Sequence, residues 1–229
     1  VFLDAGVKID TGAALDHAAA NGHCAVVKLL LENGADATKI WPLQSAIKGN
    51  HEDIVLQLLR AGTPPKTTLG WDQSTPLHWA ARRGNMEILR LLLHADLDIN
   101  ARDKYHRTPL HYATRKDVVK VLIESGAKVR VQDLAHEVTP LHDAARRGDR
   151  DVVKLLLDAG ADPNAETEDG NTAIDLADIA GHQEIVAILR RHKGKKAGDV
   201  KKPEEVLQKD DVLPEPEVRR GPPRKKRRR

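Results

Sequence analysis

The stretch TPLHWAARRGN at Thr75–Asn85 decides the fold, because its first four letters return at Thr108 and again at Thr139. The copies lie 33 and 31 residues apart, and a degenerate copy, TAIDLA, begins at Thr172, again 33 residues on. A sustained period near 33 residues indicates an array of repeated structural units.

Two earlier copies become visible in the same register. WPLQSA begins at residue 41 and AALDHAAANGH at residue 13, with Leu43 and Leu15 in the leucine slot and Ala46 and Ala18 in the alanine slot. An apolar run of helical period, such as DVVKLLLDAGAD, follows each copy. A unit with two short helices cannot bury its apolar face alone, so neighbouring units must stack. The sequence therefore predicts an all-α solenoid of helix-turn-helix units.

Capping and turn residues mark the ends of the predicted helices. Thr and Pro open the first helix of a unit, since a hydroxyl caps free amides and proline is tolerated in the first turn. Gly84, Gly148 and Asn50 end that helix where a left-handed residue fits. Segments such as ADPNAETEDGN predict extended β-hairpin fingers with a turn at the tip. The glycines that end the second helices are Gly34, Gly62, Gly126 and Gly160.

These residues resemble the ankyrin repeat family, whose repeats open on Thr-Pro-Leu-His at this period. The resemblance covers residues 1–192 and implies a partial repeat at 1–12, repeats starting near residues 13, 41, 75, 108 and 139, and a terminal repeat at 172–192.

Two departures from the repeat pattern predict local differences. The short junction between Gly34 and Trp41 leaves no room for a full finger. The fourth unit covers 18 residues from Thr108 to Gly126, where the fifth covers 21 from its threonine to its glycine. We therefore expect the fourth unit to lack the turn between its helices and to distort the stack.

The recurring histidines are the first candidates for chemistry. His78, His111 and His142 share one slot, where the family resemblance implies an imidazole that bridges the backbone of a finger and a helix; Gln44 and Asp16 fill this slot in earlier units. A metal site would need a second ligand at helical or turn spacing, and none recurs.

Other catalytic signatures are weak. Cys24 follows a histidine in sequence, but a nucleophile needs a base and an orienting group that the fold places beside it. The glycines sit at repeat junctions and do not form a phosphate-binding loop. We predict that the chain is not an enzyme and uses no metal or other cofactor.

The composition agrees with a core that consists of thin apolar layers between stacked units, because large aromatic side chains are few. The chain has 229 residues, of which 40% are hydrophobic, 31% charged and 3% aromatic. No apolar run approaches the roughly 20 residues of a membrane span, and a single cysteine fits a reducing compartment. We expect an intracellular, monomeric chain in the nucleus or cytoplasm that does not engage membranes.

The C-terminal tail, residues 193–229, differs in composition from the repeats. It holds 14 Lys and Arg against 7 Asp and Glu, a net charge of +7, so the total of +3 leaves −4 for residues 1–192. Few apolar residues and several prolines predict disorder. Three interpretations of the closing basic run stay open. It resembles a nuclear-import signal that an import receptor would bind, it would attract nucleic-acid phosphates without sequence preference, or it only makes the chain more soluble. This run comprises Arg224, Lys225, Lys226, Arg227, Arg228 and Arg229.

The predicted protein-binding site lies in repeats 3 to 5. Four of the six aromatic residues fall in two consecutive repeats, and the register places basic pairs at the ends of successive first helices. Trp, Tyr and Arg dominate interface energetics. The predicted residues are Trp71, Asp72, Trp79, Arg82, Arg83, Lys104, Tyr105, Tyr112, Arg115, Lys116, Arg146 and Arg147. The alternative is that the two helical aromatics pack between repeats and the basic pairs form a solvated face.

Three classes of function stay open. The repeats favour a non-catalytic scaffold or adaptor that grips an acidic segment with an apolar anchor, through its fingertips and the groove along its inner helices. A regulatory ankyrin segment of a larger protein is the second class. The third is a regulator that contacts nucleic acid through the basic tail alone, because the acidic repeat region repels phosphates.

Overall fold

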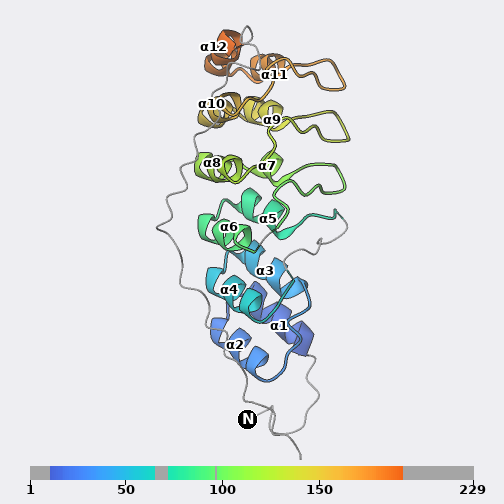
Figure 1. The fold of residues 1–229 in the computed structure, drawn as a ribbon, viewed down its shortest axis with the longest axis vertical. Coiled ribbons are helices and arrows are strands. Elements are labelled where there is room, and N and C mark those ends of the chain that lie inside the picture. The colour runs from blue at the N-terminus through green and yellow to red at the C-terminus, as the bar shows by residue number, and fades with distance from the viewer. Residues whose placement is uncertain (1–10, 65–71, 96, 193–229) are drawn as a thin grey trace, which may run out of the picture.

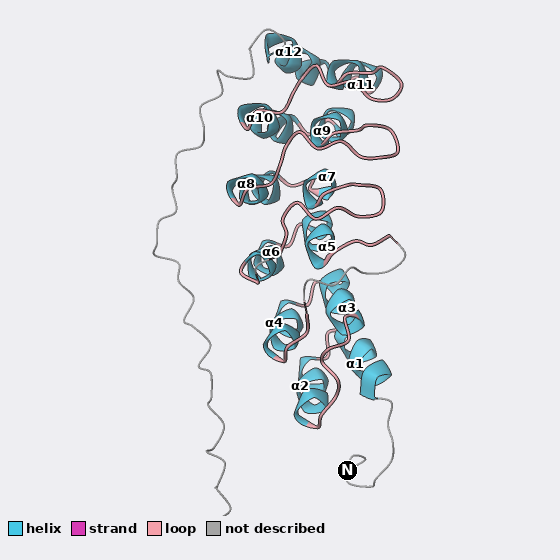
Figure 2. Cartoon of the chain, turned by 45° about the vertical axis from the view of Figure 1, so that its right-hand side comes forward, coloured by secondary structure: helices cyan, strands magenta, loops and turns pink. Residues whose placement is uncertain are grey.

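The fold is a stack of helix pairs (Figures 1 and 2). The computed structural model describes residues 11–64, 72–95 and 97–192, so the predicted tail at 193–229 and most of the partial repeat at 1–12 lie outside the described residues. The helices in the described residues are α1 (Thr11–Ala20), α2 (Cys24–Glu32), α3 (Trp41–Gly49), α4 (Glu52–Arg60), α5 (Pro76–Arg83), α6 (Met86–Leu93), α7 (Pro109–Tyr112), α8 (Lys116–Glu124), α9 (Pro140–Arg147), α10 (Arg150–Asp158), α11 (Ala173–Ile179) and α12 (Gln183–His192). The all-α prediction is confirmed.

The helices form two layers. The odd-numbered helices, here called first helices, pack against one another along the stack, and the even-numbered second helices form the layer beside them. The connections before α7, α9 and α11 project to the side as fingers (Figure 2). Residues 33–40, between α2 and α3, form a connection with two turns that is shorter than the connections carrying fingers, which confirms the missing full finger there.

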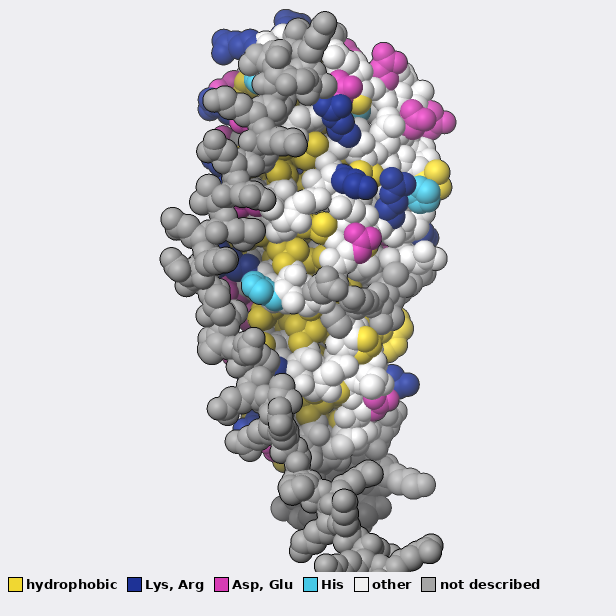
Figure 3. Space-filling model, viewed as in Figure 1, with side chains coloured by type: hydrophobic (Ala, Val, Ile, Leu, Met, Phe, Trp, Pro, Cys, Tyr) yellow, Lys and Arg dark blue, Asp and Glu magenta, His cyan; other side chains and the backbone are white. Residues whose placement is uncertain are grey.

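Leucine and alanine slots of the repeat form the core. The alanines let neighbouring helices approach closely, while each buried leucine contributes about 2 kcal/mol. Figure 3 shows apolar side chains on the surface in patches along the length of the stack. The leucines are Leu15, Leu43, Leu77, Leu110 and Leu141, each at most 2% exposed, and the alanines are Ala18, Ala46, Ala80, Ala113, Ala144 and Ala177, each at most 4% exposed.

The predicted helix ends are confirmed. Thr75 begins α5 with a capping box, and threonines begin α7, α9 and α11 in the same way. Gly84 ends α5 with φ 74°, Gly148 ends α9 with φ 87°, and Asn50 ends α3 with φ 64°. Left-handed backbone at these positions turns the chain directly into the second helix.

Helix α7 is one turn long. It has four residues, whereas α5 and α9 have eight each, and the backbone at its C-terminal cap, Ala113, is extended. The predicted loss of the inter-helix turn is thus confirmed, and the contact between α7 and α9 is the smallest in the row of first helices.

One register assignment in this region is wrong. Arg115 caps the start of α8 and Lys116 is its first residue, so the two do not lie at the end of a first helix. The residues missing from this unit are those that carry the basic pair in α5 and α9, and the chain passes straight from α7 to the second helix.

The fingers are loops with little regular pairing. A few backbone hydrogen bonds close each finger, such as Asp103 N–H to Arg107 O at 3.0 Å and Asp133 N–H to Val138 O at 2.9 Å. In the finger before α11, Glu166 and Thr172 form an isolated antiparallel bridge.

Candidate protein-binding surface

The three histidines of the repeat slot connect a helix to the next finger. His78 Nδ1 accepts a hydrogen bond from Thr75 N–H at 3.0 Å, so its Nε2 carries the proton and donates to Arg107 O at 3.0 Å. His111 and His142 repeat this arrangement with Nε2–O distances of 3.3 and 3.0 Å. Burial lowers the pKa of all three, so they are neutral at pH 7. The predicted bridging role is confirmed.

Tyr112 is committed to an internal contact. Its hydroxyl donates to Asp103 Oδ2 at 2.6 Å, and its ring meets that of His78 edge-on at 5.8 Å. Asp103 is buried and also accepts the backbone N–H groups of Tyr105 and Arg107, both at 2.9 Å. Burial raises the pKa of Tyr112, and the hydrogen bond to Asp103 raises it further. This side chain therefore fixes a finger onto α7.

Arg107 lies between two buried carboxylates that sequence reasoning did not identify. Its guanidinium is 2.8 Å from Asp133 Oδ2, in the next finger, and 3.8 Å from Asp143 Oδ2, on α9. Burial alone would lower the pKa of Arg107, but the hydrogen bond to Asp133 and the charge of Asp143 raise it. The sequence did contain one signal: the finger before α7 and the finger before α9 each have an aspartate at the turn, Asp103 and Asp133.

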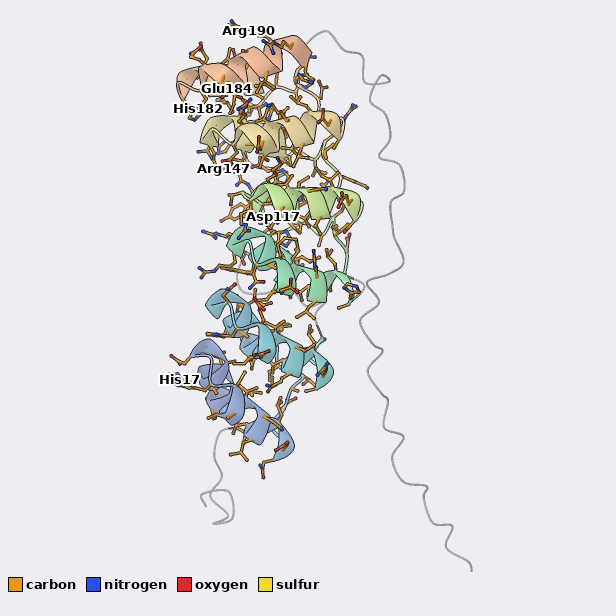
Figure 4. The ribbon with its side chains drawn as sticks, turned by 90° about the vertical axis from the view of Figure 1, so that its left-hand side faces the viewer. His17, Asp117, Arg147, His182, Glu184 and Arg190 are labelled. Carbon is orange, nitrogen blue, oxygen red and sulfur yellow. The ribbon has the colours of Figure 1, made fainter. Side chains whose placement is uncertain are left out.

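Four of the six side chains in the three predicted basic pairs already have acidic partners. Arg115 pairs with Asp117 at 2.7 Å and Lys116 with Asp151 at 3.1 Å. Figure 4 shows Asp117 and Arg147 along the edge where first helices end and second helices begin.

The pair at the end of α9 is neutralised in the same way. Arg146 binds Asp143 at 3.0 Å. Arg147 binds Asp149 at 2.7 Å and also donates to the carbonyl of Ala113 at 3.3 Å, beside the shortened α7. Internal partners thus occupy both cations, which reduces the charge that they offer to a partner.

The cations around Trp79 are different. The indole ring is half-buried on α5, with Lys48 Nζ 4.3 Å and Arg82 Cζ 5.7 Å from its centroid. Arg82 and Arg83 are exposed, and within the described ranges neither pairs with an acid. Lys48 was missed in the sequence, although it lies two residues before Asn50, as Arg82 does before its closing glycine. We call Lys48, Trp79, Arg82 and Arg83 the Trp79 cluster.

The fingertips present apolar side chains next to one another. Tyr105 is 38% exposed, with Lys104 Nζ 4.9 Å from its ring centroid, and Leu134 on the next fingertip is 66% exposed. Leu134 N–H donates to Tyr105 O at 2.8 Å, which holds the two tips together. Leu134 was missed, although a lone leucine in the polar segment VQDLAHE was a signal.

The predicted finger before α5 is described only in part. Trp71 lies outside the described residues. Asp72 accepts a hydrogen bond from Ser74 Oγ at 2.9 Å through its carboxylate, and from Lys104 N–H at 2.9 Å through its carbonyl oxygen. Its carboxylate therefore fixes its own finger.

The far end of the stack carries the opposite charge. Residues 155–189 hold eight Asp and Glu and no Lys or Arg. Figure 3 shows acidic side chains over the finger that precedes α11. In the parts of the chain that the structure covers, no three His, Cys, Asp or Glu side chains group as a metal site would require, and no helix has the length and apolarity of a membrane span.

Comparison with known proteins adds a family assignment to this geometry. A family model described as "Ankyrin repeats (3 copies)" matches residues 43–133 and 117–200, and one described as "Ankyrin repeat" matches residues 12–39.

Individual relatives differ in how much of them the chain covers. Tyrosine-protein kinase Shark of Drosophila melanogaster is 33% identical over 154 residues, which are 66% of this chain and 16% of that protein. Ankyrin repeat domain-containing protein SAT10 of Stachybotrys chartarum is 35% identical over 193 residues, which are 79% of this chain and 10% of that protein. Cyclin-dependent kinase 4 inhibitor B of Mus musculus is 34% identical over 128 residues, which are 55% of this chain and 98% of that protein. The chain thus matches a small part of the first two proteins and nearly all of the third.

Proposed function

Because this chain belongs to the ankyrin repeat family, whose repeats mediate protein–protein interaction, we propose that it is a non-catalytic scaffold or adaptor that binds an acidic, apolar-anchored segment of a partner protein. The partner lies along the fingertips and the first helices of repeats 3 to 5. The observation that carries this proposal is the exposed apolar pair Tyr105 and Leu134, held tip to tip by the hydrogen bond from Leu134 N–H to Tyr105 O.

The chemistry of the two parts of the surface favours such a segment. Tyr105 and Leu134 offer apolar area that one large side chain of a partner would cover, and Lys104 lies against the tyrosine ring. Aromatic anchors in desolvated positions carry most of the binding energy of protein interfaces. Cations on such a surface select carboxylates and speed association.

A second role fits the proteins that the chain only partly matches. Shark is named as a kinase, and the chain matches 16% of it, so a repeat segment that recruits or regulates a partner for a larger protein is compatible with the same surface. The mouse inhibitor, of which the chain covers 98%, supports the repeats acting alone. Both roles use one binding face.

The nuclear location is a separate part of the proposal and rests on the run Arg224–Arg229. A fluorescent reporter fused to residues 222–229 should accumulate in nuclei, because clustered Lys and Arg are what import receptors bind. A reporter that stays cytoplasmic would remove this part and leave the binding surface untouched.

Peptide display against the full chain tests the binding proposal. Selected peptides should combine Asp or Glu with a large apolar residue, and the best of them should bind the Tyr105→Ala/Leu134→Ala variant at least about tenfold more weakly, as expected for hot-spot residues. The matched control is Val26→Ala/Leu29→Ala, which removes two exposed apolar side chains of α2, at the other end of the stack. Equal losses for both variants would show that binding follows exposed apolar area in general and would refute the proposal.

A further inference from the structure

We propose that the acidic part of the partner segment docks at the Trp79 cluster, between α3 and α5, and not along the whole row of basic pairs. The inference rests on the proposed function and deepens it, because it assigns the carboxylate contacts to one end of the surface. The ligand class is a peptide segment with two or more neighbouring Asp or Glu side chains.

Internal neutralisation separates the basic residues into two groups. Arg115, Lys116 and Arg147 lie within 3.1 Å of Asp117, Asp151 and Asp149, respectively. A partner carboxylate at any of these three positions would compete with an acid already in place and would meet that acid's repulsion. Arg146 is held in the same way by Asp143.

The Trp79 cluster has cations without such partners. Across the described ranges, no acidic side chain forms an ion pair with Lys48, Arg82 or Arg83. Lys48 and Arg82 both lie against the Trp79 ring, so their charges are no farther apart than the sum of the two ring distances, about one Debye length at an ionic strength of about 0.1 M. The two charges repel each other, and a carboxylate placed near both removes that repulsion.

The half-buried ring strengthens the case for this position. Trp79 excludes water from one side of both cations, and partial desolvation makes ion pairs there stronger than pairs between fully exposed side chains. A cation–π contact of this kind contributes about 0.5–1 kcal/mol at exposed sites. The ring therefore holds the two positive charges in place before the ligand arrives.

The rest of the stack limits where an anionic ligand can lie. Residues 155–189 carry eight acids without a Lys or Arg, so the face near α11 repels carboxylates. A long polyanion such as a nucleic acid would extend into that acidic region. It would also be repelled by the net charge of −4 that residues 1–192 carry. The acidic part of a short peptide contacts the Trp79 cluster alone, and its apolar residue reaches Tyr105 and Leu134 on later fingers.

The test uses Trp79 as its own reporter. In the full chain with Trp41→Phe and Trp71→Phe, Trp79 is the sole tryptophan, and its emission is followed during titration with capped hexaglutamate. We expect a saturable change. Its Kd should rise at least about fivefold in Lys48→Gln/Arg82→Gln and less than twofold in the matched pair Arg115→Gln/Lys116→Gln, which removes the same charge. Unchanged helical content and melting temperature are required of each variant.

Three outcomes overturn the inference. Equal weakening by both pairs would show that binding follows net charge, and inorganic phosphate producing the same emission change at matched ionic strength would show a general anion site. The third is the absence of any saturable change with hexaglutamate. The proposed function survives each of these results if the Tyr105→Ala/Leu134→Ala variant still weakens the display-selected peptides, whereas both proposals fail if neither surface affects them.

Discussion

Lowering the pH from 7.5 to 5.5 should destabilise the stack through its three bridging histidines. His78, His111 and His142 are at most 2% exposed, and burial lowers the pKa of each below the value near 6.5 of an unfolded chain. Below pH 6.5 the unfolded chain therefore binds more protons than the folded one, so the free energy of unfolding falls as the pH falls. Above pH 6.5 the full stability is present.

The size of the effect follows from the number of protons. If none of the three is protonated in the folded state at pH 5.5, each contributes a loss of about 1.4 kcal/mol, or about 4 kcal/mol together, as an upper limit. Ordinary carboxylates stay ionised in this range, so they add little. Urea unfolding, followed by far-UV circular dichroism at pH 7.5, 6.5 and 5.5, measures the loss.

A triple glutamine variant is the control. Glutamine fills this slot naturally at Gln44, which is buried, and the replacement does not titrate. The variant keeps the other eight of the eleven histidines, so any contribution from them appears in both proteins. If wild type loses no more stability between pH 7.5 and 5.5 than the triple variant, the assignment of buried, neutral histidines is refuted.

Two further substitutions test the region around α7. Gly84→Ala should cost about 1–2 kcal/mol for its left-handed φ of 74°, plus about 0.5–1 kcal/mol because its new Cβ would lie 2.5 Å from Arg115 Cδ. The control Gly126→Ala has positive φ with no atom within 4 Å of the new Cβ, so it should show only the first cost in urea denaturation, and equal costs would contradict the contact. Arg107→Met leaves two buried carboxylates without their shared cation and should lower the unfolding free energy by about 3 kcal/mol, at the lower end for buried pairs because Arg107 is partly exposed. A loss below about 1 kcal/mol in thermal and urea unfolding would show that the cation is dispensable.

The sequence predicted well what depends on near neighbours. Thr75 and His78 form their cap within four residues, and the glycine that closes α5 follows in the same helix, so a repeated string of letters contains the whole arrangement. The shortened α7 was equally visible, because a deletion changes the spacing that defines the repeat.

The charge state of the surface could not be predicted in this way. Lys116 is neutralised by Asp151, which lies 35 residues away in the next repeat, and the three-dimensional register decides which acid faces which base. A missing segment can also be placed at several positions of an alignment with equal merit, so Arg115 was assigned to the end of a first helix when it begins α8. Lys48 was overlooked because its importance comes from the Trp79 ring, which belongs to another repeat.

The one-turn helix α7 also bears on how the stack deforms as an elastic body. In a repeat array each unit touches only its neighbours, so its bending stiffness is set joint by joint. The joint between α7 and α9 has the smallest helix contact in its row and relies on directional side-chain bonds from Arg107 and Arg147. Bending should concentrate there, which makes the span between the Trp79 cluster and the acidic last finger adjustable. We expect the two halves of the stack to change their relative orientation at this joint more readily than at any other.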